Sequence, residues 1–172
     1  AVEAHAEELL AAVRQDTRKP ENEIRVTELL NVLGNIDRNI ANLDEWMKPV
    51  EVTPSLNDKD KARIVHEARG VCLILGPWNF PFGLVMGPLA AAVAAGNCCI
   101  VKLTDLCPST ARVASKIVKA AFDEKEVALF EGGVDVATAL LELPFNHIFF
   151  TGSTRVGKVV MAAAAKNLAS VT

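Results

Sequence analysis

Apolar side chains and turn residues alternate regularly through the middle of the chain. Val71–Leu75 is a short apolar run rich in branched residues with glycine on both sides, a pattern typical of a strand buried on both faces of a parallel sheet. Small apolar residues from Leu84 to Ala95, followed by Gly-Asn, predict a helix, and Cys98–Val101 repeats the strand pattern. In a right-handed unit of this kind, the turn after the first strand lies at the carboxyl edge of the sheet, where open α/β folds bind ligands.

The residues from Val71 to Val101 carry no charge, and this stretch is long enough to span a bilayer. A membrane helix is therefore the first alternative to consider. Pro77, Pro81 and Pro88 interrupt any single helix, because proline lacks the amide donor and clashes with the preceding turn. We therefore expect a buried core and no membrane segment in this chain.

Strand and helix patterns continue to alternate through the C-terminal half. The expected elements are a helix from Pro108 to about Phe122, a strand at Val127–Phe130, a helix at Asp135–Leu143, a strand at His147–Thr151, a helix to about Asn167 and a further strand at Leu168–Thr172. Strands that alternate with helices of this length predict an α/β fold with a doubly wound parallel (Rossmann-like) sheet.

Helical periodicity dominates the N-terminal part. Residues 1–15 predict an amphipathic helix, and a longer helix from Glu21 to Trp46 carries an apolar stripe at Leu29, Leu33, Ile36, Ile40 and Leu43. Val50–Asp58 has an extended, exposed pattern, and Lys61–Ala68 fits a solvated strand or a short helix, of which we favour the strand. We therefore divide the chain into an N-terminal helical segment, residues 1–57, and a Rossmann-like domain on which it packs, residues 58–172.

Composition narrows the class without pointing to a site. The 172 residues are 51% hydrophobic and 23% charged, as expected of a soluble globular domain, and the net charge of −3 gives no support for nucleic-acid or membrane-surface binding. The four cysteines, at positions 72, 98, 99 and 107, lack the spacing of a zinc site. We expect free thiols in a reducing cytosol and hence a cytoplasmic protein.

Three groups of polar residues follow predicted strands. Gly152–Gly157 opens a helix, so its amides and the helix dipole are suited to hold a phosphate, although a serine N-cap explains the same residues. Asn79 is suited to donate to an oxyanion, or to bond nearby backbone as turn residues do. Lys102 and Asp105 are suited to grip ribose hydroxyls, or to form a surface pair. For each group considered alone, we favour the structural explanation over the functional one.

Taken together, five motifs resemble the NAD(P)-dependent aldehyde dehydrogenases, and in particular the class 3 or fatty-aldehyde branch. They are NLDEWMKP at 42–49, GPWNFP at 76–81, AAGN at 94–97, VK at 101–102 and FTGSTRVGK at 150–158. An ordered set of this kind is far more specific than any single member, and the resemblance covers essentially the whole chain. It favours the functional interpretation of all three groups.

The resemblance implies a role for each group. Asn79 would supply the oxyanion-hole amide for a thiohemiacetal, with Trp78 lining the same turn as a cofactor-binding residue. Lys102 and Asp105 would bind the adenosine ribose of NAD or NADP. The diphosphate of the cofactor would lie against Gly152, Ser153, Thr154, Arg155, Val156 and Gly157. The family reaction joins an aldehyde to a cysteine thiolate, transfers hydride to nicotinamide and hydrolyses the thioester to an acid.

Two departures from the family pattern are visible. The family usually reads Lys-Pro-Ser-Glu where this chain has Lys102-Leu103-Thr104-Asp105, so the carboxylate is shorter by one methylene. We expect this change to weaken ribose binding or to alter the cofactor preference. Ala68-Arg69-Gly70 replaces the usual Pro-Leu-Gly before the first strand, which we interpret as a surface change.

The residues that would complete the mechanism are not in this sequence. In the family, the general-base glutamate lies in a Leu-Glu-Leu-Gly-Gly-Lys motif soon after the Val-Thr matched by Val171-Thr172, and the nucleophilic cysteine follows later. Without a nucleophile and a base, the covalent mechanism cannot run. We therefore expect the N-terminal and cofactor-binding portion of an aldehyde dehydrogenase whose full-length form is a homodimer. The alternative is a truncated nucleotide-binding pseudoenzyme or structural module without turnover.

Overall fold

A five-stranded parallel sheet forms the centre of the molecule in the computed structural model, which describes residues 1–54 and 60–172. The strand order is β5-β4-β3-β6-β7, and every neighbouring pair is parallel. The strands are β3 (Val71–Leu75), β4 (Cys98–Thr104), β5 (Val127–Gly132), β6 (His147–Phe150) and β7 (Ser170–Val171). The predicted doubly wound parallel sheet is therefore confirmed.

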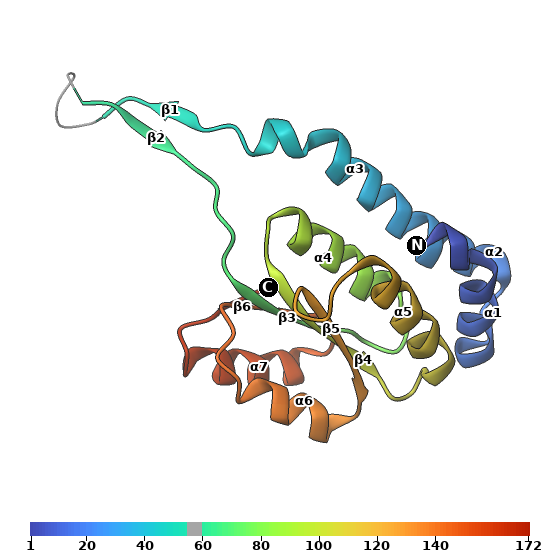
Figure 1. The fold of residues 1–172 in the computed structure, drawn as a ribbon. Coiled ribbons are helices and arrows are strands. Elements are labelled where there is room, and N and C mark those ends of the chain that lie inside the picture. The colour runs from blue at the N-terminus through green and yellow to red at the C-terminus, as the bar shows by residue number, and fades with distance from the viewer. Residues whose placement is uncertain (55–59) are drawn as a thin grey trace.

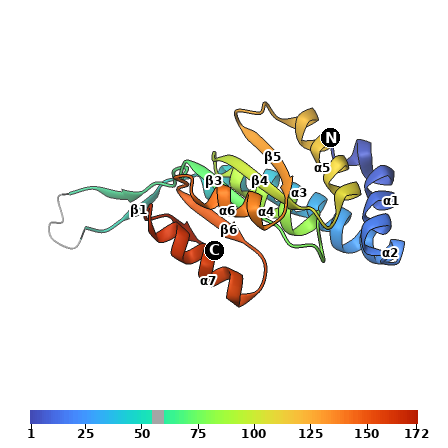
Figure 2. The same cartoon turned by 90° about the horizontal axis from the view of Figure 1, so that it is seen from below.

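Helices cover both faces of this sheet (Figures 1 and 2). The helices that connect the strands are α4 (Gly83–Ala94), α5 (Pro108–Ala121), α6 (Val134–Leu141) and α7 (Thr154–Ala165). Helices α4 and α5 lie on one face, and α6 and α7 lie on the other. The reason is that the chain adds β4 and β5 on one side of β3, then crosses back and adds β6 and β7 on the other side. The boundary between β3 and β6 is therefore the topological switch point at which open α/β sheets bind ligands.

Each face of the sheet has its own apolar core. Alternate side chains of β3 supply both, since Ile74 packs in the core beneath α4 and α5, and Leu73 packs in the core beneath α6 and α7. Phe82 and Leu9 belong to the first core and are fully buried, so the first N-terminal helix shares a core with the sheet.

The N-terminal helices lie outside α4 and α5. A short 3-10 turn (Glu3–His5) leads into α1 (Ala6–Thr17), which contacts α5. A continuous helical stretch follows, made of α2 (Glu21–Ile24), a π-helical segment (Arg25–Leu30) and α3 (Asn31–Trp46). The predicted helix from Glu21 to Trp46 has the right extent, although its π-helical segment was not predicted. Of its apolar stripe, Leu29 is buried, whereas Ile40 is 74% exposed.

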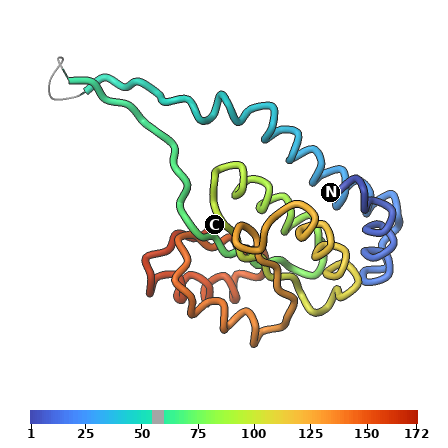
Figure 3. The backbone as a smooth tube through the Cα atoms, in the orientation of Figure 1, coloured from blue at the N-terminus to red at the C-terminus, as the bar shows by residue number. Residues whose placement is uncertain are grey.

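A two-stranded antiparallel ribbon extends away from the sheet (Figure 1). It consists of β1 (Val50–Val52) and β2 (Ala62–Ile64), and an extended segment leads from it back to β3, as the backbone path in Figure 3 shows. The predicted extended segment at Val50–Asp58 is confirmed at β1, and its part at 55–58 lies outside the described residues. The strand favoured within Lys61–Ala68 is confirmed at β2.

The apolar stretch that resembled a membrane span is folded into the sheet and α4. This helix has 12 residues with Pro88 inside it, and Val85, Met86 and Leu89 are buried. Across the described residues, no helix has both the length and the hydropathy that crossing a membrane requires.

Candidate functional site

The predicted site residues lie along one edge of the sheet, because they follow the carboxyl ends of parallel strands. Leu75 at the end of β3 is the register partner of Phe150 at the end of β6, and the Thr151 amide donates to the Leu75 carbonyl at 3.2 Å. The turn that carries Asn79 and the turn that carries Ser153 therefore leave the sheet side by side. The two turns therefore converge on the carboxyl edge of the sheet, where the sequence places the turn after the first strand.

The Asn79 turn connects β3 to α4. It begins at Gly76, whose amide donates to the Lys102 carbonyl at 3.2 Å, and a Cβ at this position would lie only 2.0 Å from Val85 Cγ2. Glycine is thus required by the close approach of α4 to the strand end. Trp78 and Asn79 are both exposed at the edge of the sheet, Trp78 by 62%. Their side chains are accessible to a ligand that binds there.

The second turn leads from β6 into α7. Ser153 is the N-cap of this helix, and its Oγ accepts from the Val156 amide at 3.4 Å. A Cβ at Gly152 would lie 2.4 Å from the Phe150 ring, so the small residue lets this ring pack against the turn. Residues 152–156 are exposed, so α7 begins at the surface of this edge.

Protein carboxylates already occupy the N-termini of the neighbouring helices α4 and α5. Glu28 Oε2 accepts from the Phe82 amide at 3.1 Å and the Gly83 amide at 2.5 Å, where α4 begins. Asp16 Oδ2 accepts from the Thr110 amide at 2.7 Å, in the first turn of α5. The first turn of α7 contains no acidic residue and is capped by a neutral hydroxyl. Since a helix N-terminus favours negative charge, α7 is the one of these three best suited to an external anion.

Lys102 lies inside β4 and not at its end, which corrects the predicted strand boundary at Val101. The strand continues because its pairing with β5 extends to Thr104 opposite Gly132. The Lys102 side chain is buried, and its ammonium donates to the Gly132 carbonyl at 2.8 Å. Burial lowers the pKa of Lys102, while the charges of Asp105 and Asp135 act to raise it. An ammonium has three donors, so this contact leaves others for a ligand.

Asp105 follows β4 and lies at the same corner as the end of β5. A Cβ on Gly133 would be 2.9 Å from Asp105 Oδ2, so the carboxylate packs against a glycine backbone. Thr104 Oγ1 donates weakly to Asp105 Oδ1 at 3.5 Å. The structure thus brings Lys102 and Asp105 together beside β5, two strands away from the Ser153 turn.

None of the four cysteines has the environment of a thiolate nucleophile. Burial raises the pKa of the Cys99 thiol to about 12, that of Cys107 to about 11, and that of Cys72 in the same direction. Cys98 is exposed, but it begins β4 and so lies at the opposite edge of the sheet from Asn79. Within the described residues there is likewise no group of three or more His, Cys, Asp or Glu side chains placed to hold a metal ion.

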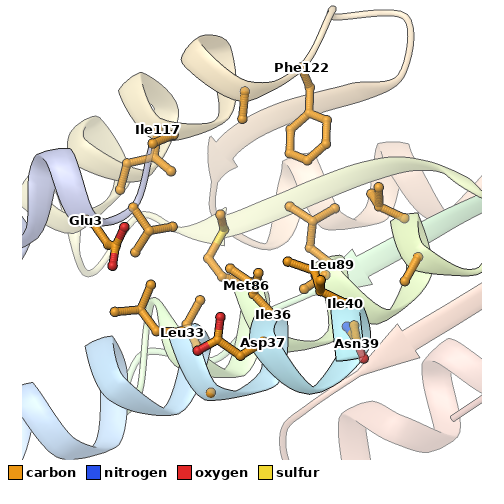
Figure 4. Close-up of a pocket in the computed structure, with 18 of the residues that line it drawn as sticks. Glu3, Leu33, Ile36, Asp37, Asn39, Ile40, Met86, Leu89, Ile117 and Phe122 are labelled. Atoms are coloured by element: carbon orange, nitrogen blue, oxygen red, sulfur yellow. The ribbon is translucent and has the colours of Figure 1, made fainter. Parts of the chain in front are cut away.

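A cavity of about 820 Å³ lies apart from this edge, between α3, α4 and α5 (Figure 4). Its walls are mainly apolar, with Ile36 and Ile40 on α3, Met86 and Leu89 on α4, and Phe122 after α5. The described residues that line it include none of the predicted site residues. We therefore place the candidate site at the sheet edge and not in this cavity.

Sequence reasoning missed three side chains that support the edge: Asp16, Lys19 and Glu28. Lys19 Nζ donates to the Asn79 carbonyl at 2.7 Å. The sequence does contain a signal for Glu28. This residue lies midway between the buried residues Ile24 and Val32 at helical spacing, where an apolar residue is expected. Asp16 and Lys19 left no such signal, since both resemble ordinary polar residues near the end of a helix.

Comparisons with known proteins identify the family of the chain. Residues 1–172 match the Aldehyde dehydrogenase family. The chain is 56% identical over 169 residues to AldX of Bacillus subtilis, covering 98% of this chain and 38% of that protein. It is 42% identical over 173 residues to aldehyde dehydrogenase family 3 member A2 of Macaca fascicularis, covering 99% and 36%. A substrate-bound structure of Staphylococcus aureus AldH superimposes with a TM-score of 0.96 at 38% identity, over 99% of this chain and 38% of that one. The chain therefore spans less than two fifths of these relatives' length.

Proposed function

Because the chain belongs to the aldehyde dehydrogenase family and is similar to its class 3 branch, we propose that it forms the cofactor-binding part of an enzyme that oxidises an aldehyde to a carboxylic acid with NAD or NADP. The observation that carries the proposal is the contrast between helix N-termini at the sheet edge. Those of α4 and α5 are capped by Glu28 and Asp16, while that of α7 is open to an anion. A dinucleotide supplies such an anion in its diphosphate.

Each edge residue has a part in this proposal. The α7 turn, Gly152–Gly157, holds the diphosphate with its amides, and Lys102 with Asp105 bonds the adenosine ribose. Trp78 lies against the cofactor from the neighbouring turn. Solved relatives of the same fold contain NAD⁺ in one case and NADP⁺ in another, which supports a nicotinamide dinucleotide without deciding between the two. When bound, the dinucleotide accepts the hydride that leaves the substrate.

Asn79 has the catalytic role in this proposal. Its side-chain amide donates a hydrogen bond to the aldehyde oxygen as a thiol adds to the carbonyl carbon and negative charge develops on that oxygen. The thiolate must come from elsewhere, because the four cysteines of this chain are buried or at the wrong edge. The family mechanism also needs a general base. We propose that both groups belong to a part of the protein outside these residues.

The test is a titration of the protein that carries this chain with NAD and with NADP, followed by assay of aldehyde oxidation through the absorbance of the reduced dinucleotide. We expect saturable binding that weakens about tenfold or more when Lys102→Met removes one charge-assisted contact to the cofactor. Lys125→Met is a matched control, since Lys125 lies before β5, at the opposite edge of the sheet. Binding without turnover of any aldehyde would favour a nucleotide-binding module, and no binding of either dinucleotide would contradict the proposal.

A further inference from the structure

We infer that Lys19 is a positioning residue for Asn79, holding the backbone of the oxyanion turn from the N-terminal helices. This inference rests on the proposed function, because it assigns the turn a task that only the aldehyde reaction requires. Lys19 is 60 residues away from Asn79 in the sequence, yet its ammonium lies 2.7 Å from the Asn79 carbonyl oxygen. It touches the main chain of the same residue whose side chain we assign to the oxyanion.

Lys19 meets the turn through two contacts, one with each of two successive residues. Besides the Asn79 carbonyl, the ammonium lies 3.4 Å from the centroid of the Phe80 ring, a cation–π arrangement. Glu23 Oε1 also lies 3.5 Å from the ammonium, but it belongs to α2 and not to the turn. The lysine side chain is only 18% exposed, and its two contacts with the turn place the ammonium against Asn79 and Phe80.

The residues on both sides of Lys19 restrict its backbone, as a positioning residue requires. Arg18 ends α1 in the left-handed conformation, with φ of 59°, and its amide still bonds the Arg14 carbonyl at 2.9 Å. Pro20 follows immediately with φ of −59° and leads into α2. Lys19 is therefore fixed between a helix end and a proline, and its side chain leaves a well-defined point of the main chain.

Other contacts hold the turn at its two ends. The Cys107 thiol donates to the Trp78 carbonyl at 3.4 Å, and Glu28 accepts from the amides of Phe82 and Gly83. Between these anchors Asn79 is exposed, and its carbonyl accepts a hydrogen bond from Lys19. Rotation of that peptide would move the Asn79 side chain away from the developing oxyanion. Misplacement of a catalytic group by about 1 Å costs on the order of 100-fold in rate.

The inference is tested by steady-state kinetics of Lys19→Met, Lys19→Arg and Glu23→Gln in the complete enzyme. For Lys19→Met we expect kcat to fall roughly 10- to 100-fold, with KM for the aldehyde and Kd for the dinucleotide within about twofold of wild type. Lys19→Arg keeps a charged donor over Phe80 and should recover most of kcat. Glu23→Gln removes the ion pair but leaves the bond to Asn79, so it serves as the matched control and should retain wild-type kcat.

Three results would overturn the inference. The first is an unchanged kcat in Lys19→Met. The second is a loss of dinucleotide affinity and thermal stability in parallel with kcat, which would assign Lys19 to the stability of the fold. The third is a wild-type enzyme that oxidises no aldehyde, which overturns the proposed function and the inference with it. The first two leave the proposed function intact, so the two failures are distinguishable.

Discussion

Glu28 and Gly83 are joined by a buried hydrogen bond of 2.5 Å, from the Gly83 amide to the carboxylate Oε2. The residues are 55 positions apart, and the bond fixes the π-helical segment to the start of α4. The Glu28 side chain is fully buried, and within the described residues its Oε1 has no hydrogen-bond partner. Such a carboxylate is stabilised on one oxygen and desolvated on the other.

The first prediction concerns the pH dependence of folding. Desolvation raises the pKa of Glu28 above its ordinary value of 4.5, against the opposing hydrogen bonds from Gly83 and Phe82. The folded state therefore binds more protons than the unfolded state as pH rises from about 4.5 to the raised pKa, and stability falls across that window. Above it, the loss is complete. Glu28→Gln removes the titrating group.

Urea unfolding of wild type and Glu28→Gln at several pH values from about 4 to 7 measures this effect. We expect the stability of wild type relative to the variant to decrease as pH rises. Val26→Ala is the control, because Val26 lies in the same π-helical segment, is 60% exposed and carries no titratable group. If the stability of wild type relative to Glu28→Gln increased with rising pH, the pKa of Glu28 would not be raised as stated.

The second prediction concerns the cap of α5. Asp16 accepts from the Ser109 amide at 3.3 Å, the Thr110 amide at 2.7 Å and the Thr110 hydroxyl at 2.8 Å. Asp16→Ala removes all three bonds, and loss of an N-cap costs about 1–2 kcal/mol. We expect a decrease of that size in the free energy of unfolding, measured by chemical denaturation. Asp37→Ala, at an exposed position on α3, should change it little.

The third prediction concerns thiol reactivity. Cys98 is exposed, whereas Cys72, Cys99 and Cys107 are buried, and burial raises the pKa of each of the three. We expect a thiol reagent at neutral pH to label Cys98 rapidly in the native state and the other three only after unfolding. Peptide mapping by mass spectrometry identifies the labelled sites. Rapid native labelling of Cys107 would show that the contact with the Trp78 carbonyl opens readily.

Much of the fold was predictable because its signals are local. The runs at Val71–Leu75 and His147–Phe150 are short, apolar and bounded by turn residues, so their pattern does not depend on distant partners. Once both strands belong to a parallel sheet, topology alone brings the turns of Asn79 and Ser153 to one edge. The family motifs then gave those turns their expected roles, which remain proposals for this chain.

The missed features are those that depend on distant parts of the chain. Lys102 was placed at a strand end because the apolar run stops at Val101, but pairing with β5 carries the strand to Thr104. Ile40 follows helical period with Leu33 and Ile36, yet it is exposed, because α4 and α5 leave a cavity opposite it. Bonds such as Lys19 to Asn79 span 60 residues and leave no periodic trace in the sequence.

The N-terminal helices supply the side chains that cap α4 and α5. The N-terminal helices and the sheet domain therefore depend on each other for stability. Unfolding of the helices around Asp16 and Glu28 would leave unpaired amides at the start of α4 and α5. A partly unfolded state is therefore little favoured in free energy. We therefore expect one cooperative transition, in which circular dichroism and tryptophan fluorescence change together on denaturation. Two separate transitions would show that the bonds from Asp16 and Glu28 are too weak to couple the unfolding of the N-terminal helices to that of the sheet.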